Sequence, residues 1–197
     1  MILRVIRGRA ARERVIPLRA VLDEHLGLRT GAGASEGDLP ERYHLAIRAS
    51  DPVDEVLILA CWRSPEAVAR KDAQNTSALA LTRDSMADVG VEHFEVDTNV
   101  LRDPEATPTA LRIATGRFSR PGGDIRMQDL LRERLPNVGP EMTEAYVGRR
   151  LAGRTVEVTF VSLWRSVPEG QRLEDAFWPD ISVQYDEFNV EVYRPVD

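Results

Sequence analysis

The sequence predicts an α+β protein built from two copies of one βαββαβ unit. Three observations predict this fold. Short segments recur in the same order in both halves, strand-like and helix-like periodicities alternate in the same order in each half, and a central strand is apolar on both faces. The chain has 197 residues, of which 43% are hydrophobic, so it can bury a substantial core.

Three short segments of the first half return in the second half with similar sequences. They are LRVIRGR (3–9) and LRIATGR (111–117), CWRSPE (61–66) and LWRSVPE (163–169), and FEV (94–96) and VEV (190–192). Because their order is kept while only the spacing changes, we take residues 1–98 and 109–197 as two repeats. Residues 99–108 are then a linker, which the polar, proline-containing sequence in this region favours.

Periodicity predicts six elements in the first repeat. They are a strand over 2–9, a helix over 11–26, a hairpin with arms 42–49 and 55–63, an alanine-rich helix over 66–89 with a break at 75–77, and a strand over 91–97. Pro17 lies inside the first of these helices, where a proline removes a backbone donor.

The second repeat follows the same order. Its elements are a strand over 110–118, a helix over 124–135, hairpin arms over 142–150 and 154–164, a shorter helix over 170–177 and a strand over 187–194. Each unit then forms a four-stranded antiparallel sheet with both helices on one face, which is a ferredoxin-like arrangement. The bare face of each sheet is apolar and needs a partner, for which the other repeat is the nearest candidate.

Composition and charge exclude several classes of function. The chain has 32 acidic and 26 basic side chains, so its net charge is -6, and no basic stripe for nucleic acid is present. Cys61 is the single cysteine, so no intramolecular disulfide or thiolate metal cluster forms, and we expect a cytoplasmic protein. We expect neither a signal peptide nor a membrane span, because no apolar stretch has the length that either needs, and no nucleotide-binding glycine motif occurs.

The segment Trp62-Arg63-Ser64-Pro65-Glu66-Ala67, between a strand and a helix, resembles the dimeric α/β barrel superfamily and its antibiotic biosynthesis monooxygenase (ABM) domains. Residues 164–169 repeat this motif in weaker form. The resemblance implies two ferredoxin-like units packed sheet to sheet as an intrachain α/β barrel, in a monomer or a homodimer of it. It also implies a cavity between sheet and helices that takes a small, flat, apolar or aromatic molecule.

Activity is expected to be cofactor-independent oxygenation of a phenolic or quinol substrate, without metal or other cofactor. Deprotonation of such a substrate gives an anion that reduces O₂, and the protein stabilises the developing charge. Candidate catalytic residues are His44, Tyr43 and Arg9, and candidate substrate-binding residues are Trp62, Asn75, Arg4 and Trp164. Tyr43 and His44 are adjacent on one strand and point to opposite faces, so only one of them enters a given cavity.

Two alternatives remain open. The first is a non-catalytic binding or structural protein, in which the tryptophans are core residues and Asn75 is a helix cap. The second is haem binding or degradation, which the absence of a histidine from both second helices disfavours. His25, His44 and His93 lack the close spacing of a local metal site. Because the second helix of the second repeat is shorter, we expect the working site in the first repeat.

Overall fold

The computed structural model describes residues 1–25, 39–74, 82, 84–103, 105–118, 122–152, 154–166 and 185–196. The chain divides into two compact units. Unit 1 comprises Met1–His93 with Val196–Asp197, and unit 2 comprises Phe94–Pro195. The predicted α+β class is confirmed, because antiparallel strands and α-helices build both units.

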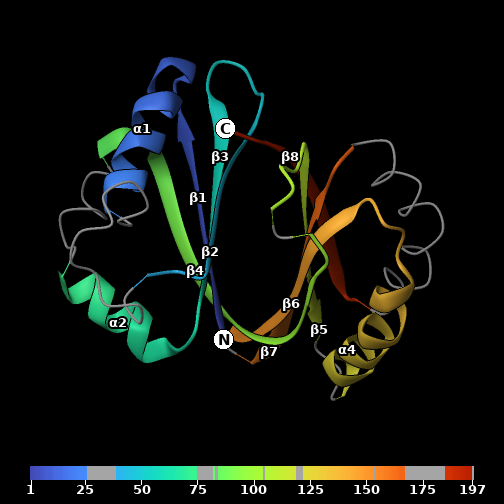
Figure 1. Ribbon diagram of the computed structural model, residues 1–197. Coiled ribbons are helices and arrows are strands. Elements are labelled where there is room, and N and C mark those ends of the chain that lie inside the picture. The colour runs from blue at the N-terminus through green and yellow to red at the C-terminus, as the bar shows by residue number, and fades with distance from the viewer. Residues whose placement is uncertain are drawn as a thin grey trace. The chain divides into compact units, whose positions relative to one another are not determined.

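Unit 1 is a sheet with helices on one face (Figure 1). Its elements are β1 (Ile2–Ala10), α1 (Arg12–His25), β2 (Arg42–Arg48), β3 (Asp54–Trp62), α2 (Pro65–Gln74) and the first part of β4 (Ala87–Leu101). Strand β3 pairs antiparallel with β1 on one side and with β2 on the other. Ion pairs from Arg7 to Glu92 and from Arg9 to Asp88 join β1 to β4.

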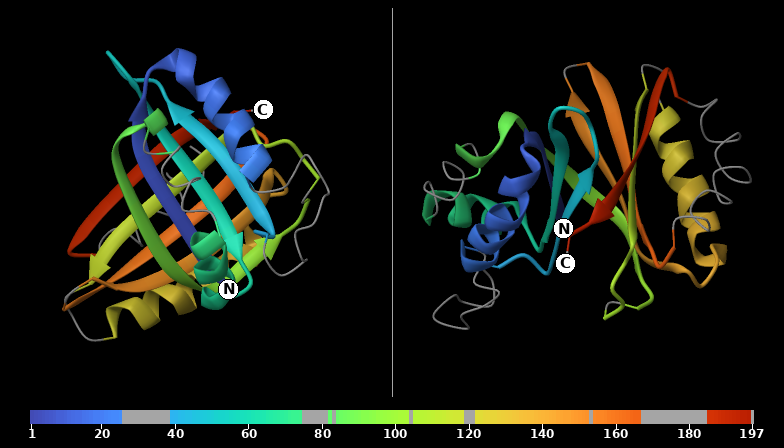
Figure 2. Two further views of the ribbon diagram at one scale, coloured as in Figure 1. Left: turned by 90° about the vertical axis from the view of Figure 1, so that its left-hand side faces the viewer. Right: turned by 90° about the horizontal axis from the view of Figure 1, so that it is seen from above.

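Unit 2 repeats this arrangement in its described part. Its elements are the second part of β4, β5 (Ala110–Phe118), α4 (Gly123–Arg134), a 3-10 turn (Leu135–Asn137), β6 (Met142–Ala152), β7 (Thr155–Trp164) and β8 (Glu187–Pro195). Helix α4 covers one face of this sheet (Figure 2). The strand order is β8-β5-β7-β6 in unit 2 and β4-β1-β3-β2 in unit 1, which in both cases is the ferredoxin-like order.

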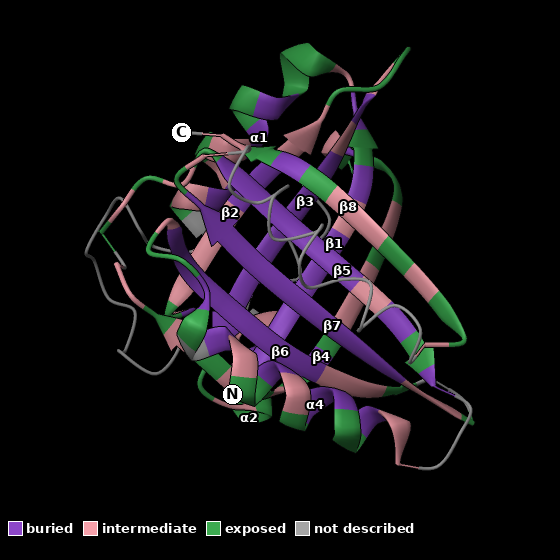
Figure 3. Cartoon of the chain, turned by 90° about the vertical axis from the view of Figure 1, so that its right-hand side faces the viewer, coloured by how far each residue is buried: buried purple, intermediate pink, exposed green. Residues whose placement is uncertain are grey.

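Both faces of each sheet are buried. In unit 1, Ile6, Leu45 and Ile58 pack under Val15, Leu18 and Leu22 of α1. The opposite face carries Leu3, Val5, Leu57 and Leu59, each at most 1% exposed. In unit 2, β7 is buried along nearly its whole length (Figure 3). The predicted two-sided apolar character of the central strands is therefore confirmed. None of the described helices has the length and apolar composition needed to span a membrane.

The observed elements differ from the predicted ones mainly around β4. This strand begins at Ala87, within the predicted helix 66–89, and continues to Leu101, within the predicted linker 99–108. The alanine-rich composition before residue 87 masks a period-two pattern that starts with Val89 and Val91. The boundary between the compact units falls at His93 and Phe94, inside β4. The predicted helix 170–177 lies outside the described residues.

Helix α1 continues through Pro17. A proline in a helix removes one backbone donor, but Val15, Leu18 and Leu22 of the same helix are buried in the unit 1 core. Tertiary packing of the apolar face stabilises a helix more than the propensity of a single residue does. The predicted helix over 11–26 is therefore confirmed to within one residue at each end.

Candidate ligand-binding site

The candidate site begins with a small residue, Ala60, at the centre of the unit 1 sheet. Across the strands, Ala60 pairs with Arg4 of β1 on one side and with Tyr43 of β2 on the other. Adjacent strands lie about 4.8 Å apart, so the backbones of Arg4 and Tyr43 are about 10 Å apart with Ala60 between them. Trp62 follows two residues later on β3 and points to the same face. These four side chains all face the helices.

Helix α2 covers this face because the Trp-Arg-Ser-Pro-Glu-Ala segment encodes a helix start. Ser64 is the N-cap, and its Oγ accepts a hydrogen bond from the Ala67 amide at 3.2 Å. A hydrogen bond from Ser64 also lowers the pKa of the Glu66 carboxyl. Trp62 and Ala67 belong to one buried cluster, whose other members are Ile2, Ala60 and Val68. The motif therefore fixes α2 over the tryptophan.

Arg4 is a buried cation with one acidic partner. It is 7% exposed, and its Nη1 donates to Oδ1 of Asp72 on α2 at 2.6 Å. Asp72 lies one helical turn after Val68, so the helix that packs on Trp62 also holds the arginine. The Nε of Arg4 is buried and makes no hydrogen bond within the described part of the chain. The Nε–H of the Arg4 guanidinium is thus left for another group.

Trp62 and Tyr43 carry two further polar atoms of this kind. The Nε1 of Trp62 and the hydroxyl of Tyr43 are both buried, and neither has a hydrogen-bond partner among the described residues. Burial raises the pKa of Tyr43 above its usual value, so this hydroxyl keeps its proton at neutral pH. Arg19 of α1 lies over its ring, with Cζ 5.7 Å from the centroid.

Three unsatisfied polar groups on one face of one sheet are unusual. Each buried donor without an acceptor costs about 1–3 kcal/mol, and native proteins leave few of them. Arg4 and Tyr43 both pair with Ala60, and Trp62 stands two residues further along β3, where it pairs with Ile2. The arrangement offers several hydrogen-bond donors to an oxygen-bearing group placed between the sheet and the helices.

In unit 2, the indole N–H of the equivalent tryptophan, Trp164, has a hydrogen-bond acceptor within the unit. In the matching register, Ser162 takes the place of Ala60, with Arg112 on one side and Ala145 on the other. The Nε1 of Trp164 donates to the Ser162 Oγ at 2.8 Å. The Nε of Arg112 is buried without a hydrogen bond, as in Arg4, although this side chain makes other interactions. The tryptophan donor of unit 2 therefore has its acceptor within the chain.

An aromatic cluster also fills part of the helix-facing layer of unit 2. The ring of Tyr185 lies directly on Gly116, with Phe118 and Phe188 at centroid distances of 4.4 and 5.0 Å. In unit 1, the equivalent glycine is Gly8, which has Met86 as its neighbour. Burial raises the pKa of Tyr185 as it does that of Tyr43.

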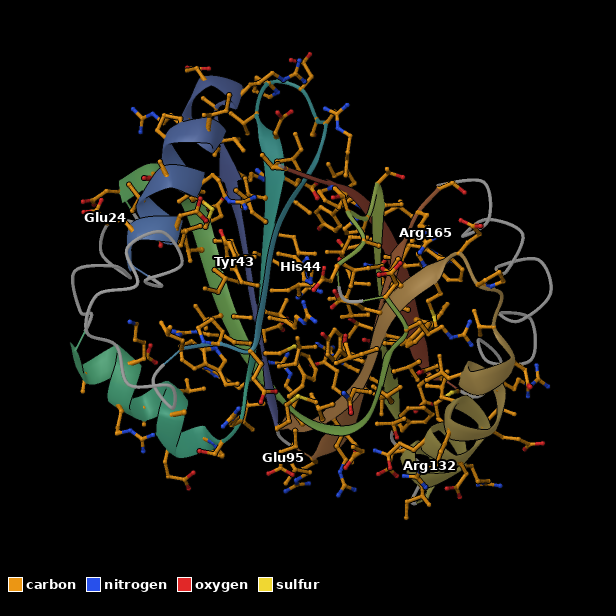
Figure 4. The ribbon with its side chains drawn as sticks, in the orientation of Figure 1. Glu24, Tyr43, His44, Glu95, Arg132 and Arg165 are labelled. Atoms are coloured by element: carbon orange, nitrogen blue, oxygen red, sulfur yellow. The ribbon has the colours of Figure 1, made fainter. Side chains whose placement is uncertain are left out.

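Of the predicted site residues, Arg4, Tyr43 and Trp62 share the helix-covered face of the unit 1 sheet, with Tyr43 packed on the cluster under α1 and Trp62 in the cluster under α2. His44 points to the opposite face of β2, where it pairs with Leu59 (Figure 4). Arg9 also belongs to the opposite face, and its side chain is 58% exposed beside Asp88 at 3.6 Å. Trp164 is in unit 2, where Ser162 satisfies it, and Asn75 lies outside the described residues.

Two residues that the sequence analysis did not single out contribute to the site. Ala60 lies between Arg4 and Tyr43 in the sheet, and Asp72 accepts a hydrogen bond from Arg4. A comparison of the two repeats offers a signal for Ala60, because Ala60 and Ser162 both stand two residues before the tryptophan. No signal marks Asp72, whose role depends on how α2 packs. Among the described residues, no group of His, Cys, Asp or Glu side chains is arranged to hold a metal ion.

No protein-family model matches the sequence, and no curated protein matches it either. Solved structures do match over the whole chain. A "putative monooxygenase" of Fusobacterium nucleatum has a TM-score of 0.73 at 11% identity, covering 100% of this chain and 92% of its own. An anthrone oxidase-like protein has a TM-score of 0.60 at 16% identity, with coverages of 100% and 91%.

A third solved structure links the fold to the ABM group. A Listeria monocytogenes ferredoxin fold protein, described as related to antibiotic biosynthesis monooxygenases, has a TM-score of 0.55 at 8% identity. The match covers 100% of this chain and 95% of that protein. At such low identities the likeness shows the fold alone. The chain thus has the fold of ABM-like proteins, as the Trp-Arg-Ser motif predicts.

Proposed function

We propose that unit 1 binds a small, flat, largely apolar aromatic molecule and oxygenates it without a cofactor. The observation that carries this proposal is the set of three buried, unsatisfied polar atoms, Arg4 Nε, Trp62 Nε1 and the Tyr43 hydroxyl, on the helix-covered face of the sheet. A phenolic or quinol oxygen is the group that such donors complement. The names of two proteins with this fold, the Fusobacterium monooxygenase and the anthrone oxidase-like protein, support the same class of reaction.

The proposed chemistry follows from the donors. A phenolic substrate must lose a proton before it reduces O₂, and the resulting anion is stabilised by preorganised N–H donors. Arg4 and Trp62 supply these groups, while Tyr43 stays protonated and acts as a third donor. His44 faces the other side of β2 and is not assigned as the base, so the proton passes to solvent.

Anthrone is a suitable first substrate because it is flat, tricyclic and in equilibrium with a phenol. Its reaction with O₂ needs no outside reductant: the CH₂ carbon becomes a carbonyl, one oxygen atom of O₂ enters the product anthraquinone, and the other leaves as water with the two hydrogens. The four electrons that the carbon loses reduce O₂ completely. The substrate therefore supplies every electron that the reaction requires.

The experiment measures O₂ uptake and anthraquinone formation with the purified protein, together with anthrone binding by equilibrium dialysis under nitrogen. We expect Trp62→Phe to lower affinity and rate by about tenfold or more, because it keeps the ring but removes the donor. Trp164→Phe is the matched control in unit 2 and should leave both values unchanged.

The outcomes separate the candidate functions. Binding with no O₂ uptake above the uncatalysed rate would support the non-catalytic alternative, in which the chain only holds its ligand. An equal loss in both tryptophan variants would contradict the placement of the site in unit 1. Absence of anthrone binding would remove the support for a tricyclic ligand, and native mass spectrometry of gently purified protein would then identify any retained molecule.

We also propose that the two units are copies of one ancestral unit. The same strand order, the arginine on the first strand and the tryptophan at the end of the third strand support this proposal. Their packing sheet to sheet as an intrachain barrel stays a prediction, as does the oligomeric state. Native mass spectrometry tests the oligomeric state, with a monomer or a homodimer expected.

A further inference from the structure

We infer that Ala60 determines the ligand specificity of this site, because its missing hydroxyl keeps the Trp62 indole N–H available for a ligand oxygen. The site therefore selects aromatic molecules that carry a carbonyl or phenolate oxygen over hydrocarbons of the same shape. This inference rests on the proposed function and specifies which atoms of the ligand are recognised.

The two units provide the internal evidence. Ala60 and Ser162 occupy the same register position, opposite an arginine of the first strand and two residues before the tryptophan. In unit 2, the Ser162 Oγ accepts the Trp164 N–H at 2.8 Å. In unit 1, Ala60 has no acceptor to offer, and the Trp62 N–H has none among the described residues. One side-chain oxygen thus accounts for the different state of the two tryptophans.

The chemistry of the unsatisfied atoms defines the ligand. The indole Nε1 of Trp62 and the guanidinium Nε of Arg4 are donors only, and neither accepts a hydrogen bond. Tyr43 keeps its proton and adds a hydroxyl donor. A ligand must therefore present acceptor oxygen atoms to this face. A hydrocarbon ring would leave the donors buried and unpaired, which lowers its affinity relative to an oxygenated analogue.

Asp72 explains why a neutral carbonyl is sufficient. The Arg4 guanidinium already has a carboxylate partner at 2.6 Å, so the positive charge does not require an anionic ligand. The Nε–H of Arg4 and the Nε1–H of Trp62 would therefore orient a ligand oxygen by hydrogen bonding, without adding an uncompensated charge. An aryl ketone and a phenolate share the acceptor oxygen that the two donors recognise.

The test compares 1-tetralone with tetralin, which has the same carbon skeleton but no oxygen. Equilibrium dialysis measures the Kd of each for the wild-type chain, for Ala60→Ser and for Ala60→Cys. The serine places an acceptor where Ser162 stands in unit 2. The cysteine adds a side chain of comparable size with a much weaker acceptor, so it controls for lost space. Urea unfolding verifies that each variant is folded.

We expect the wild-type chain to bind 1-tetralone at least about tenfold more tightly than tetralin. Ala60→Ser should reduce this preference severalfold, because the serine hydroxyl accepts the Trp62 N–H while the Arg4 and Tyr43 donors stay available, and Ala60→Cys should keep the preference. Retention of the full preference in Ala60→Ser, or an equal loss in both variants, would overturn the inference. A wild-type chain that binds both probes equally well would also overturn it while leaving aromatic binding in place. If neither probe binds, the proposed function fails together with the inference.

Discussion

The layers around Trp62 and Trp164 are alike in backbone and unlike in hydrogen bonding. Both tryptophans end the third strand of their unit, and both are 1% exposed. Trp164 donates to Ser162, whereas Trp62 lies beside Ala60 and has no acceptor among the described residues. The difference teaches that the Trp-Arg-Ser motif specifies where the ring sits in both units and, in unit 1, how helix α2 starts. Under the proposal above, recognition of a ligand depends on Ala60, a residue outside the motif.

Among substitutions that test this comparison, the largest difference in stability is expected at the equivalent glycines of the two units. A Cβ added at Gly116 would lie 1.8 Å from the Tyr185 ring, whereas one at Gly8 would lie 3.0 Å from the flexible end of Met86. Gly116→Ala should therefore lower the free energy of unfolding by about 2–3 kcal/mol, and Gly8→Ala by clearly less. Urea unfolding of the two variants measures both values.

The glycine comparison has a clear contrary result. Equal destabilisation by Gly116→Ala and Gly8→Ala would mean that the Tyr185 ring moves aside with little loss of stability. The aromatic cluster would then not be tightly packed against Gly116. Tyr185→Ala combined with Gly116→Ala is the matched control, because the alanine methyl has room once the ring is gone.

An intermediate effect is expected from removing the acceptor of unit 2. Ser162→Ala leaves the Trp164 N–H buried and unpaired, which should lower the free energy of unfolding by about 1–2 kcal/mol. Ser162→Ala should lower stability by less in a Trp164→Phe background than in the wild type, because the indole donor is then absent. A fully neutral Ser162→Ala would show that a buried indole N–H without an acceptor has little cost in this fold, which would weaken the argument from Trp62.

The fold and part of the site were predictable because they depend on local patterns. Alternating and helical periodicities located β1, α1, the β2–β3 hairpin and their counterparts in unit 2. The same patterns placed Ala60 and Trp62 on one face of β3, since residues two apart on a strand share a face. That Arg4 and Tyr43 share this face depends on the register between strands, which periodicity does not give. The opposite orientation of Tyr43 and His44 followed from the same rule.

The remaining features depend on packing between elements. Helix α2 brings Asp72 to Arg4 across 68 residues of sequence, and no local pattern records that contact. The length of β4 was underestimated because an alanine-rich segment precedes its period-two pattern. The state of each tryptophan N–H required the strand register, which sets Ala60 and Ser162 in equivalent positions.

The smallest effect is expected at Tyr43. Tyr43→Phe removes a buried hydroxyl that has no hydrogen-bond partner among the described residues, so we expect the free energy of unfolding at pH 7 to stay the same or to rise by about 1 kcal/mol. Burial raises the pKa of Tyr43 in the folded chain, so the unfolded chain releases this proton first, at about pH 10. Stability is therefore retained below pH 10 and falls as the pH rises further, by about 1.4 kcal/mol per pH unit for one group.

Urea unfolding at pH 8 and pH 11 tests this dependence. Tyr43→Phe should lose less stability between the two pH values than the wild type. Tyr185→Phe is the matched variant in unit 2, where burial raises the pKa in the same direction. An alkaline loss that is the same in the wild type and in both variants would assign it to other groups.

The different hydrogen bonding of the two indole groups also allows NMR to follow ligand binding. A hydrogen-bonded indole proton resonates downfield of one without an acceptor and exchanges more slowly with solvent deuterium. The Trp164 proton, held by Ser162, and the Trp62 proton should therefore give separate NMR signals. Of these two signals, occupancy of the unit 1 site should shift only the Trp62 signal, so a proton spectrum would follow binding without any added label.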